Sequence, residues 1–298
     1  MADPNPILIA GKSGRVAQDL VAEAARLGVA ARALGRPELD IENADTIARV
    51  IAATRPCGIV NAAAVGMVDE AERDHARAFA LNRDGAARLA AAAAREKIPF
   101  LHISTDFVFD GGKRTPYRED DAPAPLNAYG RSKLAGEQAV REAHPSAFVF
   151  RTAWVYGPHG NNFLTAMLRL AEKQESVRVV ADQVGSPTAG ADLARALLDI
   201  ATLLAAGLQA PPGLYHLAGS GETSWHGLAE AIFSGWARRG KRVPRLEPIA
   251  MADWPSPAQR PPYSALDCSK VAGAFGIRLP AWQESVERAL DALHPAKA

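Results

Sequence analysis

Apolar residues along the first half of the chain follow two alternating patterns. Short apolar runs, typical of buried strands, occur at 6–10, 29–34, 58–63, 100–104 and 147–154. Between several of these runs, residues 14–28, about 71–97 and 127–143 repeat apolar positions at intervals of three and four, as amphipathic helices do. Strands that alternate with helices indicate a parallel sheet covered on both faces. This half therefore predicts a doubly wound α/β fold.

The second half is less regular. Residues 161–173 and 189–204 have helical periodicity, 177–180 and 213–219 resemble short strands, and 243–262 is rich in proline. We expect a smaller C-terminal α/β domain that covers one end of the sheet, with one or two elements returning to the sheet. The predicted division lies near residue 155 and separates residues 1–155 from residues 156–298.

Charge and composition narrow the range of partners. The 34 basic and 33 acidic side chains nearly cancel, so we expect neither a nucleic acid nor a membrane surface as partner. The first 14 residues lack the pattern of a secretory signal, and the alanine-rich segments carry too many charges to span a membrane. Cys57 and Cys268 are far apart and have no metal-ligand spacing. These features predict a cytoplasmic protein with reduced thiols that binds a small molecule.

The first apolar run ends in a glycine turn of the form G-x-x-G-x-x-A at residues 11–17. Gly11 permits a tight turn, Gly14 lets a pyrophosphate approach the backbone, and Ala17 lets the helix lie against the strand. The alternative is that the two glycines only form a turn. Their place between a strand and an amphipathic helix favours a Rossmann-type dinucleotide site in residues 1–155, with residues 156–298 mainly binding the substrate. The predicted cofactor contacts in the turn are Gly11, Ser13, Gly14, Arg15 and Val16.

The end of the second strand bears on the choice of cofactor. It reads Leu34-Gly35-Arg36, without the acid that usually accepts from the ribose hydroxyl of NADH. Arg36 therefore slightly favours NADPH, with NADH tolerated, although an ordinary exposed arginine is the alternative. Asp40 and Ile41 are predicted near the adenine, and Asp40 could equally cap a local turn. After the third strand, the predicted cofactor contacts are Ala63, Ala64 and Val65.

Tyr129 and Lys133 are the candidates for proton transfer. A spacing of four puts both on one face of the predicted helix 127–143. A free tyrosine has a pKa near 10, and a neighbouring ammonium lowers it by favouring the phenolate. The same lysine can hold a ribose hydroxyl of the cofactor. Alone, such a pair is more often found on the surface, so its weight depends on the neighbouring segments.

The fourth strand supplies that context. It runs into Thr105 and Asp106 at the carboxyl end of the sheet, where ligands bind in such folds. A hydroxyl there can bond a substrate carbonyl or the phenol of Tyr129, although a simple turn at the strand end is the alternative. Together these residues predict ketone reduction, with hydride from a nicotinamide and a proton from Tyr129.

Longer segments then identify a family. The stretches GKSGRV, NAAA, STDFVFDG, YGRSK and RTAWVYG resemble the extended short-chain dehydrogenase/reductase superfamily. The stretches GNNFLTAMLRLA, DQVGSPT, GLYHLAGSGETSWHGLA, PSPAQRPPYSALD and LPAWQESV extend the resemblance over essentially the whole chain and narrow it to the dTDP-4-dehydrorhamnose reductases. The resemblance implies reduction of the 4-keto group of dTDP-4-dehydro-β-L-rhamnose to dTDP-β-L-rhamnose with NADPH or NADH.

The resemblance also implies roles for single residues in the reaction. Tyr129 would donate the proton, Lys133 would position the nicotinamide ribose, and Thr105 would tune the tyrosine. Asp106 and Trp154 match positions that contact the sugar. The predicted substrate contacts are completed by Arg260, whose guanidinium can hold a diphosphate through two hydrogen bonds; a surface cation beside a proline pair is the alternative.

Two departures from the family pattern limit the transfer. The common STDYVF reads STDFVF here, so Phe107 offers only apolar contact near the substrate. Some relatives bind magnesium at a dimer interface through glutamates, one of which follows a glycine-alanine pair. Here Asp192 follows that pair, and the chain ends in ALDALHPAKA. We therefore predict no metal site, while the resemblance still allows a homodimer.

Two other functions stay open at this point. One is the same reduction on another 4-keto-deoxysugar nucleotide, because the sequence does not show how the base and the sugar epimer are recognised. The other is a non-catalytic regulatory subunit that keeps the dinucleotide fold and serves a partner protein. The presence of Thr105, Tyr129, Lys133 and Trp154 argues against the regulatory function, since such a subunit needs no proton relay.

Overall fold

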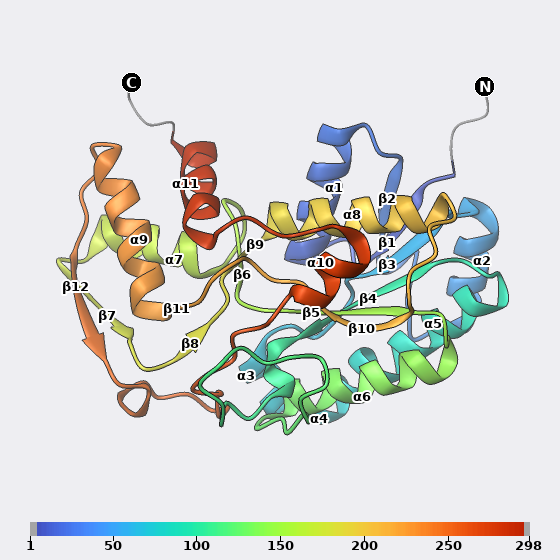
Figure 1. Cartoon of the computed structure of the whole chain (residues 1–298), viewed down its shortest axis with the longest axis horizontal. Coiled ribbons are helices and arrows are strands. Elements are labelled where there is room, and N and C mark those ends of the chain that lie inside the picture. The colour runs from blue at the N-terminus through green and yellow to red at the C-terminus, as the bar shows by residue number, and fades with distance from the viewer. Residues whose placement is uncertain (1–4, 295–298) are drawn as a thin grey trace.

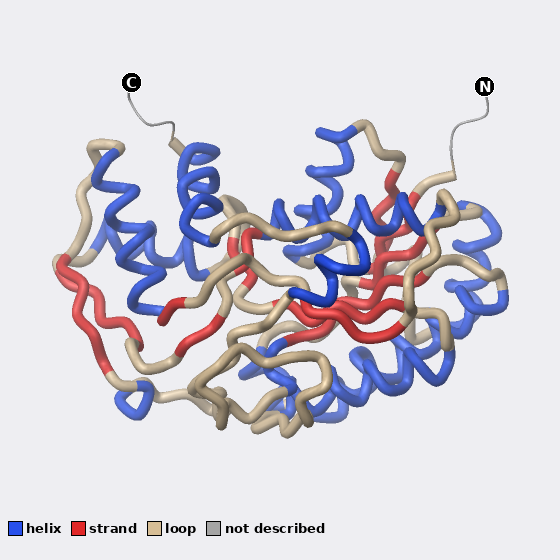
Figure 2. The backbone as a smooth tube through the Cα atoms, in the orientation of Figure 1, coloured by secondary structure: helices blue, strands red, loops and turns tan. Residues whose placement is uncertain are grey.

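A six-stranded parallel sheet forms the centre of the molecule. The computed structural model describes residues 5–294. The strands lie in the order β10-β5-β4-β3-β1-β2 (Figures 1 and 2). Their bounds are β1 Ile7–Ala10, β2 Ala31–Leu34, β3 Gly58–Asn61, β4 Phe100–Thr105, β5 Phe148–Thr152 and β10 Gly213–His216. The predicted strands are thus present, and β10 brings the chain back from the second half to the sheet.

Helices cover both faces of this sheet, which confirms the doubly wound α/β fold. One face is covered by α1 (Arg15–Leu27), α8 (Gly190–Ala205) and α10 (Ser269–Phe275), whose apolar side chains share one core cluster with the strands. The other face is covered by α2 (Ala44–Thr54), α5 (Ala86–Arg95) and α6 (Ala128–Ala143). Gly28 ends α1 with a φ of 68°, the left-handed conformation that a C-terminal glycine adopts readily.

The stretch at 71–97, predicted as one helix, is divided into four parts. These are α3 (Val68–Arg73), α4 (His75–Phe79), the π-helical turn η1 (Ala80–Gly85) and α5. The Asp74 side chain accepts a hydrogen bond from the Arg77 amide and so starts a new helix. Within η1, Gly85 packs so closely on Ile41 that a Cβ atom would lie 2.9 Å from its Cγ1. The interruption therefore follows from capping and tertiary contacts, which apolar periodicity does not reveal.

The second half builds its own core beside one end of the sheet. Helices α7 (Phe163–Lys173), α9 (Trp225–Arg238) and α11 (Trp282–Leu293) pack together there with short strands. The strand pairs are β7 (Ser176–Val180) with β12 (Arg245–Ile249), β6 (Val155–Tyr156) with β9 (Thr188–Ala189), and β8 (Val184–Gly185) with β11 (Thr223–Ser224). Strand β12 lies in the proline-rich stretch, where Pro248 is tolerated because a two-stranded sheet leaves one side of each strand unpaired.

Side chains close the outer edge of β10. The carboxylate of Glu119 accepts a hydrogen bond from the His216 amide at 2.8 Å, and the ammonium of Lys270 donates to the Leu214 carbonyl at 2.6 Å. Both backbone groups belong to residues whose amide and carbonyl point away from β5. These two outward groups of the β10 edge are therefore satisfied within the chain.

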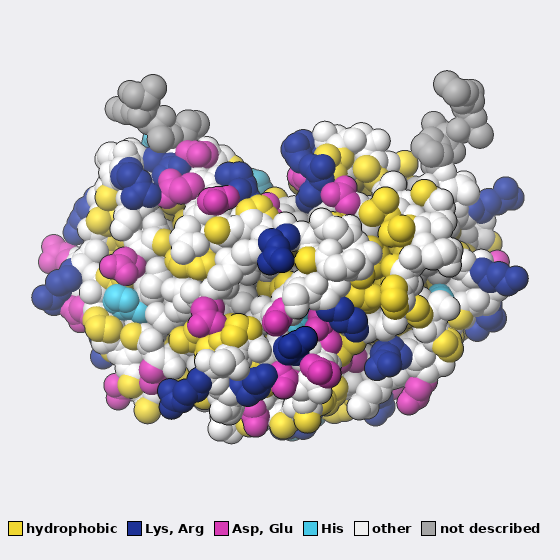
Figure 3. Space-filling model, in the orientation of Figure 1, with side chains coloured by type: hydrophobic (Ala, Val, Ile, Leu, Met, Phe, Trp, Pro, Cys, Tyr) yellow, Lys and Arg dark blue, Asp and Glu magenta, His cyan; other side chains and the backbone are white. Residues whose placement is uncertain are grey.

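The surface agrees with the balanced composition. Figure 3 shows basic and acidic side chains interspersed over the face in view. Among the described residues, no helix has both the length and the apolar content needed to cross a membrane.

Candidate active site

The glycine turn meets the loop after β3 at the carboxyl edge of the sheet. Gly11 has a φ of 105°, and a Cβ atom there would lie 2.8 Å from the Ala63 amide nitrogen. Only glycine allows this conformation and this approach. Strands β1 and β3 are the point where the strand order reverses, and ligands bind at such a point in open α/β sheets.

The first turn of α1 is suited to an anion. Gly14 is its N-cap residue, and no side chain within residues 5–294 caps this end. The Gly14 amide donates to the Gly11 carbonyl at 3.2 Å, so the backbone amides of Ser13, Arg15 and Val16 are the donors that fit a cofactor pyrophosphate. The Arg15 side chain points elsewhere, because its guanidinium donates to the carbonyls of Val155, at 2.5 Å, and Asn161. Val16 packs against the core of the sheet.

The predicted adenosine end has a mixed charge. Arg36 is exposed, as the cofactor prediction requires, but Lys12 and Glu38 form an exposed ion pair of 3.0 Å close by. Glu38 is an acid near this edge that the sequence reasoning did not consider, because it lies four residues beyond the strand. Asp40 forms a local turn in which its Oδ1 accepts from the Glu42 amide at 3.0 Å. Ile41 is buried under Gly85.

A buried asparagine fixes the loop after β3. Asn82 in η1 accepts a hydrogen bond from the Val65 amide at 2.8 Å and donates to the Val65 carbonyl at 3.2 Å. It also donates to the Ser132 hydroxyl on α6 at 2.9 Å. Asn82 therefore joins the loop Ala63–Val65 to the helix of the predicted proton donor. Sequence reasoning missed it; the one signal was a polar asparagine and a glycine interrupting an alanine-rich helix.

Helix α6 places Tyr129 and Lys133 one turn apart. Asn127 caps the helix by accepting from the Gly130 amide at 2.8 Å. A Cβ atom at Gly130 would lie 2.1 Å from the Phe107 carbonyl oxygen, so only glycine lets the helix start this close to the end of β4. Tyr129 is partly exposed and Lys133 is buried.

The two side chains differ in how their environment shifts their pKa values. Burial raises the pKa of Tyr129 to about 12, while a hydrogen bond with Thr105 lowers it and the Asp106 charge raises it. Burial lowers the pKa of Lys133 to about 8, and the Glu137 charge opposes that shift. The Lys133 ammonium donates to the Ile103 carbonyl at 2.6 Å. At neutral pH the phenol therefore carries its proton, as a proton donor must. The predicted lowering of the Tyr129 pKa by the Lys133 ammonium is wrong for this structure, because burial raises that pKa and the ammonium is bonded to the Ile103 carbonyl.

Thr105 and Asp106 lie beside that phenol. The Thr105 hydroxyl donates to Asp106 Oδ1 at 3.1 Å, and the other oxygen of Asp106 accepts from the Ser264 hydroxyl at 2.6 Å. Burial raises the pKa of Asp106 to about 7. The ring of Phe107 meets the Tyr129 ring edge to face, with centroids 6.1 Å apart. The structure thus brings together the four predicted polar residues of β4, α6 and the short 3₁₀ turn η2 (Asp106–Val108).

Trp154 comes to the site in a strained conformation. Its φ is 46°, and its indole stacks on Trp225 at 3.6 Å between centroids. A Cβ atom at Gly185 would lie 2.5 Å from the same indole, so glycine is required beneath it. The buried Nε1 of Trp154 has no hydrogen-bond partner within residues 5–294. A buried donor without a partner is consistent with contact to a ligand.

Arg260 lies at the rim of the site and is paired with a carboxylate. Its Nη2 atom lies 3.2 Å from Asp69 Oδ1 on α3. The neighbouring Gln259 carbonyl accepts from Asn127 at 2.7 Å, which ties this segment to the start of α6. These contacts hold the Arg260 guanidinium near the site. The Asp69 carboxylate is the anion that the guanidinium binds in this structure.

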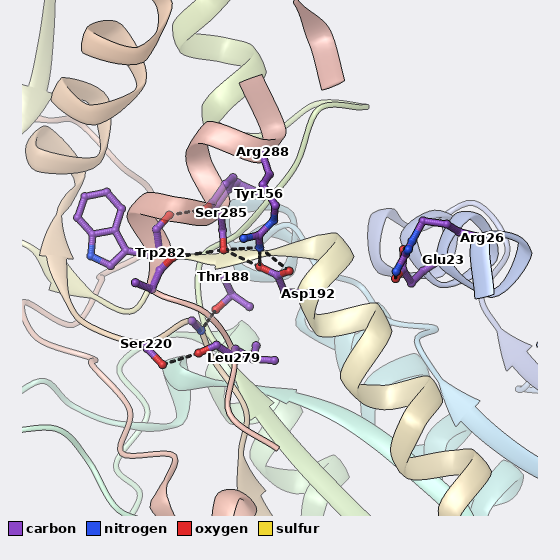
Figure 4. Close-up of polar contacts among 12 residues, drawn as sticks. Glu23, Arg26, Tyr156, Thr188, Asp192, Ser220, Leu279, Trp282, Ser285 and Arg288 are labelled. Carbon is purple, nitrogen blue, oxygen red and sulfur yellow. Dashed lines mark hydrogen bonds and ion pairs between the residues drawn. The ribbon is translucent and has the colours of Figure 1, made fainter. Parts of the chain in front are cut away.

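The carboxylate that follows the glycine-alanine pair has its partners within the chain. Asp192 on α8 accepts from Arg288 Nη2 through both oxygens, at 2.7 and 2.6 Å, and from the Ser285 hydroxyl at 2.5 Å (Figure 4). Both donors lie on α11, which is also held by a hydrogen bond of 3.0 Å from the Tyr156 hydroxyl to the Trp282 carbonyl. A guanidinium and a hydroxyl therefore hold this carboxylate within one chain, and the absence of a metal site stays a prediction.

Comparisons with known proteins agree with this geometry. The family model "RmlD substrate binding domain" matches residues 5–294. A dTDP-4-dehydrorhamnose reductase of Sinorhizobium fredii is 44% identical over 288 residues, which cover 96% of this chain and 97% of the relative.

Solved structures give the same result. A dTDP-4-dehydrorhamnose reductase from Clostridium acetobutylicum superposes with a TM-score of 0.88 at 33% identity, over 97% of this chain and 99% of the other. The enzyme of that name from Bacillus anthracis, solved in complex with NADP, gives 0.86 at 34% identity with the same coverage. The resemblance read from the sequence motifs is confirmed, and the chain belongs to the dTDP-4-dehydrorhamnose reductase family.

Proposed function

We propose that this chain reduces the 4-keto group of dTDP-4-dehydro-β-L-rhamnose to give dTDP-β-L-rhamnose, with a reduced nicotinamide dinucleotide as donor. The observation that carries the proposal is the placement of Tyr129, Thr105 and Lys133 at the carboxyl edge of β4, beside the glycine turn. Family membership over the whole described chain supports the choice of substrate.

Each group has a chemical task in this reaction. The bound nicotinamide supplies hydride to the carbonyl carbon. Tyr129 delivers its proton to the carbonyl oxygen. The Thr105 hydroxyl, which donates to Asp106 in this structure, then lowers the cost of the resulting phenolate by donating to it instead. The Lys133 ammonium, now on the Ile103 carbonyl, also stabilises the phenolate and holds the nicotinamide ribose.

The remaining predicted contacts recognise the substrate. Asp106 and the Nε1 atom of Trp154 bind sugar hydroxyls. Asp106 is a buried carboxylate beside Tyr129, and the Trp154 nitrogen is a buried donor that no group of residues 5–294 satisfies. Arg260 binds the diphosphate by exchanging its bond to Asp69 for bonds to phosphate oxygens. The cofactor pyrophosphate is held by the backbone amides of Ser13, Arg15 and Val16.

NADPH is the slightly favoured donor. Exposed Arg36 supports this preference, and the Lys12–Glu38 pair places both a cation and an anion close to the same edge, so NADH is accepted as well. A cytoplasmic location and a homodimer belong to the proposal as predictions from the sequence.

The experiment is turnover of enzymatically generated dTDP-4-dehydro-L-rhamnose with NADPH, followed by the loss of NADPH absorbance and by NMR of the product. We expect dTDP-β-L-rhamnose. Turnover only with a different 4-keto-deoxysugar nucleotide would replace the substrate in the proposal. No turnover with any of them, together with tight binding to another protein, would contradict the enzymatic function.

A further inference from the structure

A buried charged cluster lies directly beneath the proposed reaction centre. It consists of Ser104 on β4, Glu137 on α6 and Arg151 on β5, which we name the floor cluster. Arg151 donates to the two oxygens of Glu137 at 2.8 Å from Nε and 2.7 Å from Nη2. The Ser104 hydroxyl donates to the same carboxylate at 2.5 Å. This bidentate pair is almost fully excluded from water, with 3% and 5% of the two side chains exposed.

Each member of the floor cluster adjoins a residue of the site. Ser104 precedes Thr105, Arg151 lies three residues before Trp154, and Glu137 lies one helical turn after Lys133. Tyr129, Lys133 and Glu137 therefore form one stripe along α6, at intervals of four. The carboxylate is aimed at the β5 side by Arg151, and its charge acts on the ammonium of Lys133 one turn before it on the helix.

A buried ion pair is costly unless its geometry is good, so its retention beneath a site calls for a physical reason. The Lys133 ammonium donates to the Ile103 carbonyl, its one hydrogen-bond partner within residues 5–294, and burial works against its charged form. The negative charge of Glu137, one turn away, favours the protonated form of Lys133. The positive charge of Arg151 on the other side of that carboxylate weakens this effect. The balance of Glu137 and Arg151 thus acts on the group that must stay cationic during proton transfer.

We infer that Glu137, held by Arg151 and Ser104, is a positioning residue that keeps Lys133 protonated and so sets the upper pH limit of proton transfer from Tyr129. The part that concerns proton transfer rests on the proposed function. Glu137 acts through Lys133 and does not touch the substrate. It affects the reaction only by changing the pH at which Lys133 loses its proton.

Other titratable groups face this region from the elements packed on it. His102 on β4 faces Lys133, and burial lowers its pKa well below the usual range. His216 on β10 faces Arg151, and burial lowers its pKa to about 3. Both imidazoles are therefore neutral between pH 6 and 10 and add no changing charge. Asp106 acts on Tyr129 and is common to every variant below.

The test separates charge from structure by two substitutions that act in opposite directions. Glu137→Gln removes the negative charge and should lower the apparent pKa of Lys133, whereas Arg151→Gln frees the carboxylate to act on Lys133 and should raise it. Shifts of roughly one unit are expected when a charge about one helical turn away, or the cation that offsets it, is removed in a buried environment. Ser104→Ala keeps both charges and is the matched control, with little expected shift.

Two measurements follow these shifts. The first is the titration of the Lys133 side chain by NMR of lysine labelled with ¹³C at Cε, assigned with a Lys133→Arg spectrum, in the protein without substrate. The second is the upper limb of the kcat/KM profile, which reports the ionisations of the free enzyme. Opposite shifts of the two charge variants support the inference. Equal shifts, shifts of one sign, or a Ser104→Ala shift as large as that of Glu137→Gln would overturn it.

The two readouts also keep this inference apart from the proposed function. If wild type does not turn over the nucleotide sugar while the NMR shifts are opposite, the proposed function fails and the control of the Lys133 charge stands. If wild type is active and the NMR midpoints coincide, the inference alone fails. Circular dichroism of each variant at each pH shows that the folded state is the one titrated.

Discussion

Two ion pairs near the site differ in how far they are removed from water. In the floor cluster, Arg151 and Glu137 are joined by bonds of 2.7 and 2.8 Å with side chains 3% and 5% exposed. At the rim, Arg260 and Asp69 are 3.2 Å apart, with 23% and 35% exposed. The floor pair is fixed before any ligand arrives, and the rim pair can exchange one partner for a ligand. Preorganised charge thus lies below the reacting atoms, and exchangeable charge lies where an anionic substrate enters.

The largest effect on the reaction is expected at Tyr129, which lies above the floor cluster and next to the reacting atoms. Tyr129→Phe should reduce kcat by roughly 10²–10⁴, the usual contribution of a positioned acid. The Kd for NADPH should change little, because the proposed function assigns the ribose contact to Lys133. Steady-state kinetics and a fluorescence titration measure the two quantities. Tyr117→Phe, which removes a hydroxyl bonded to Asp110, is the control. A Tyr129→Phe variant with full kcat would show that another group donates the proton.

A stability measurement compares the two pairs directly. Arg151→Gln should lower the free energy of unfolding by about 3–5 kcal/mol, because it leaves a buried carboxylate without its cation. Arg260→Gln should cost about 1 kcal/mol or less, as for other exposed pairs. Urea unfolding of both variants and wild type gives these values. Similar losses at the two positions would mean that burial does not distinguish them.

Arg260 should instead affect binding of the substrate. Arg260→Gln should raise KM for the nucleotide sugar about 10- to 100-fold, since a hydrogen bond to a charged group contributes about 1.5–3 kcal/mol. We expect kcat to change far less, because the diphosphate is remote from the reacting carbonyl. Arg245→Gln, at an exposed position on β12, is the matched control. A fall in kcat with constant KM would place Arg260 in the chemistry and remove the contrast between floor and rim.

The smallest effect concerns the cofactor. Arg36→Ala should shift the ratio of KM for NADPH to KM for NADH about 2- to 5-fold towards NADH, because a single exposed cation contributes less than about 1 kcal/mol. Kinetics with both cofactors, and Arg49→Ala on α2 as a second exposed arginine, provide the comparison. An unchanged ratio would leave Arg36 as an ordinary surface charge.

Local patterns made most of the sheet predictable. Each strand follows from its own apolar run, and α1 follows from its apolar periodicity and from Gly28 at its end. Every one of these signals lies within the element that it predicts or directly beside it. The π-helical turn and β12 do not, because they depend on contacts between distant segments. Asn82 bonds to Val65, 17 positions away, and β12 pairs with β7 although it contains Pro248.

The same distinction holds for the site. The spacing of Tyr129 and Lys133 is local, so the sequence could predict that they share a helix face. Glu137 continues that stripe on α6 by one turn, but its partner Arg151 comes from strand β5. The sequence analysis singled out neither residue. The contact of Arg260 with Asp69 spans 191 positions. No periodicity in the sequence could have shown that a carboxylate would pair with Arg260, the residue predicted to bind the diphosphate.

The closed edge of β10 has a consequence for how copies of this chain can meet. An exposed edge strand offers a template on which a strand of another molecule can add, and this is a route to ordered aggregation. Here Glu119 and Lys270 already occupy the outward amide of His216 and the outward carbonyl of Leu214. A strand of a second copy would have to displace both side chains to pair with these two groups, so growth of the sheet at β10 is disfavoured.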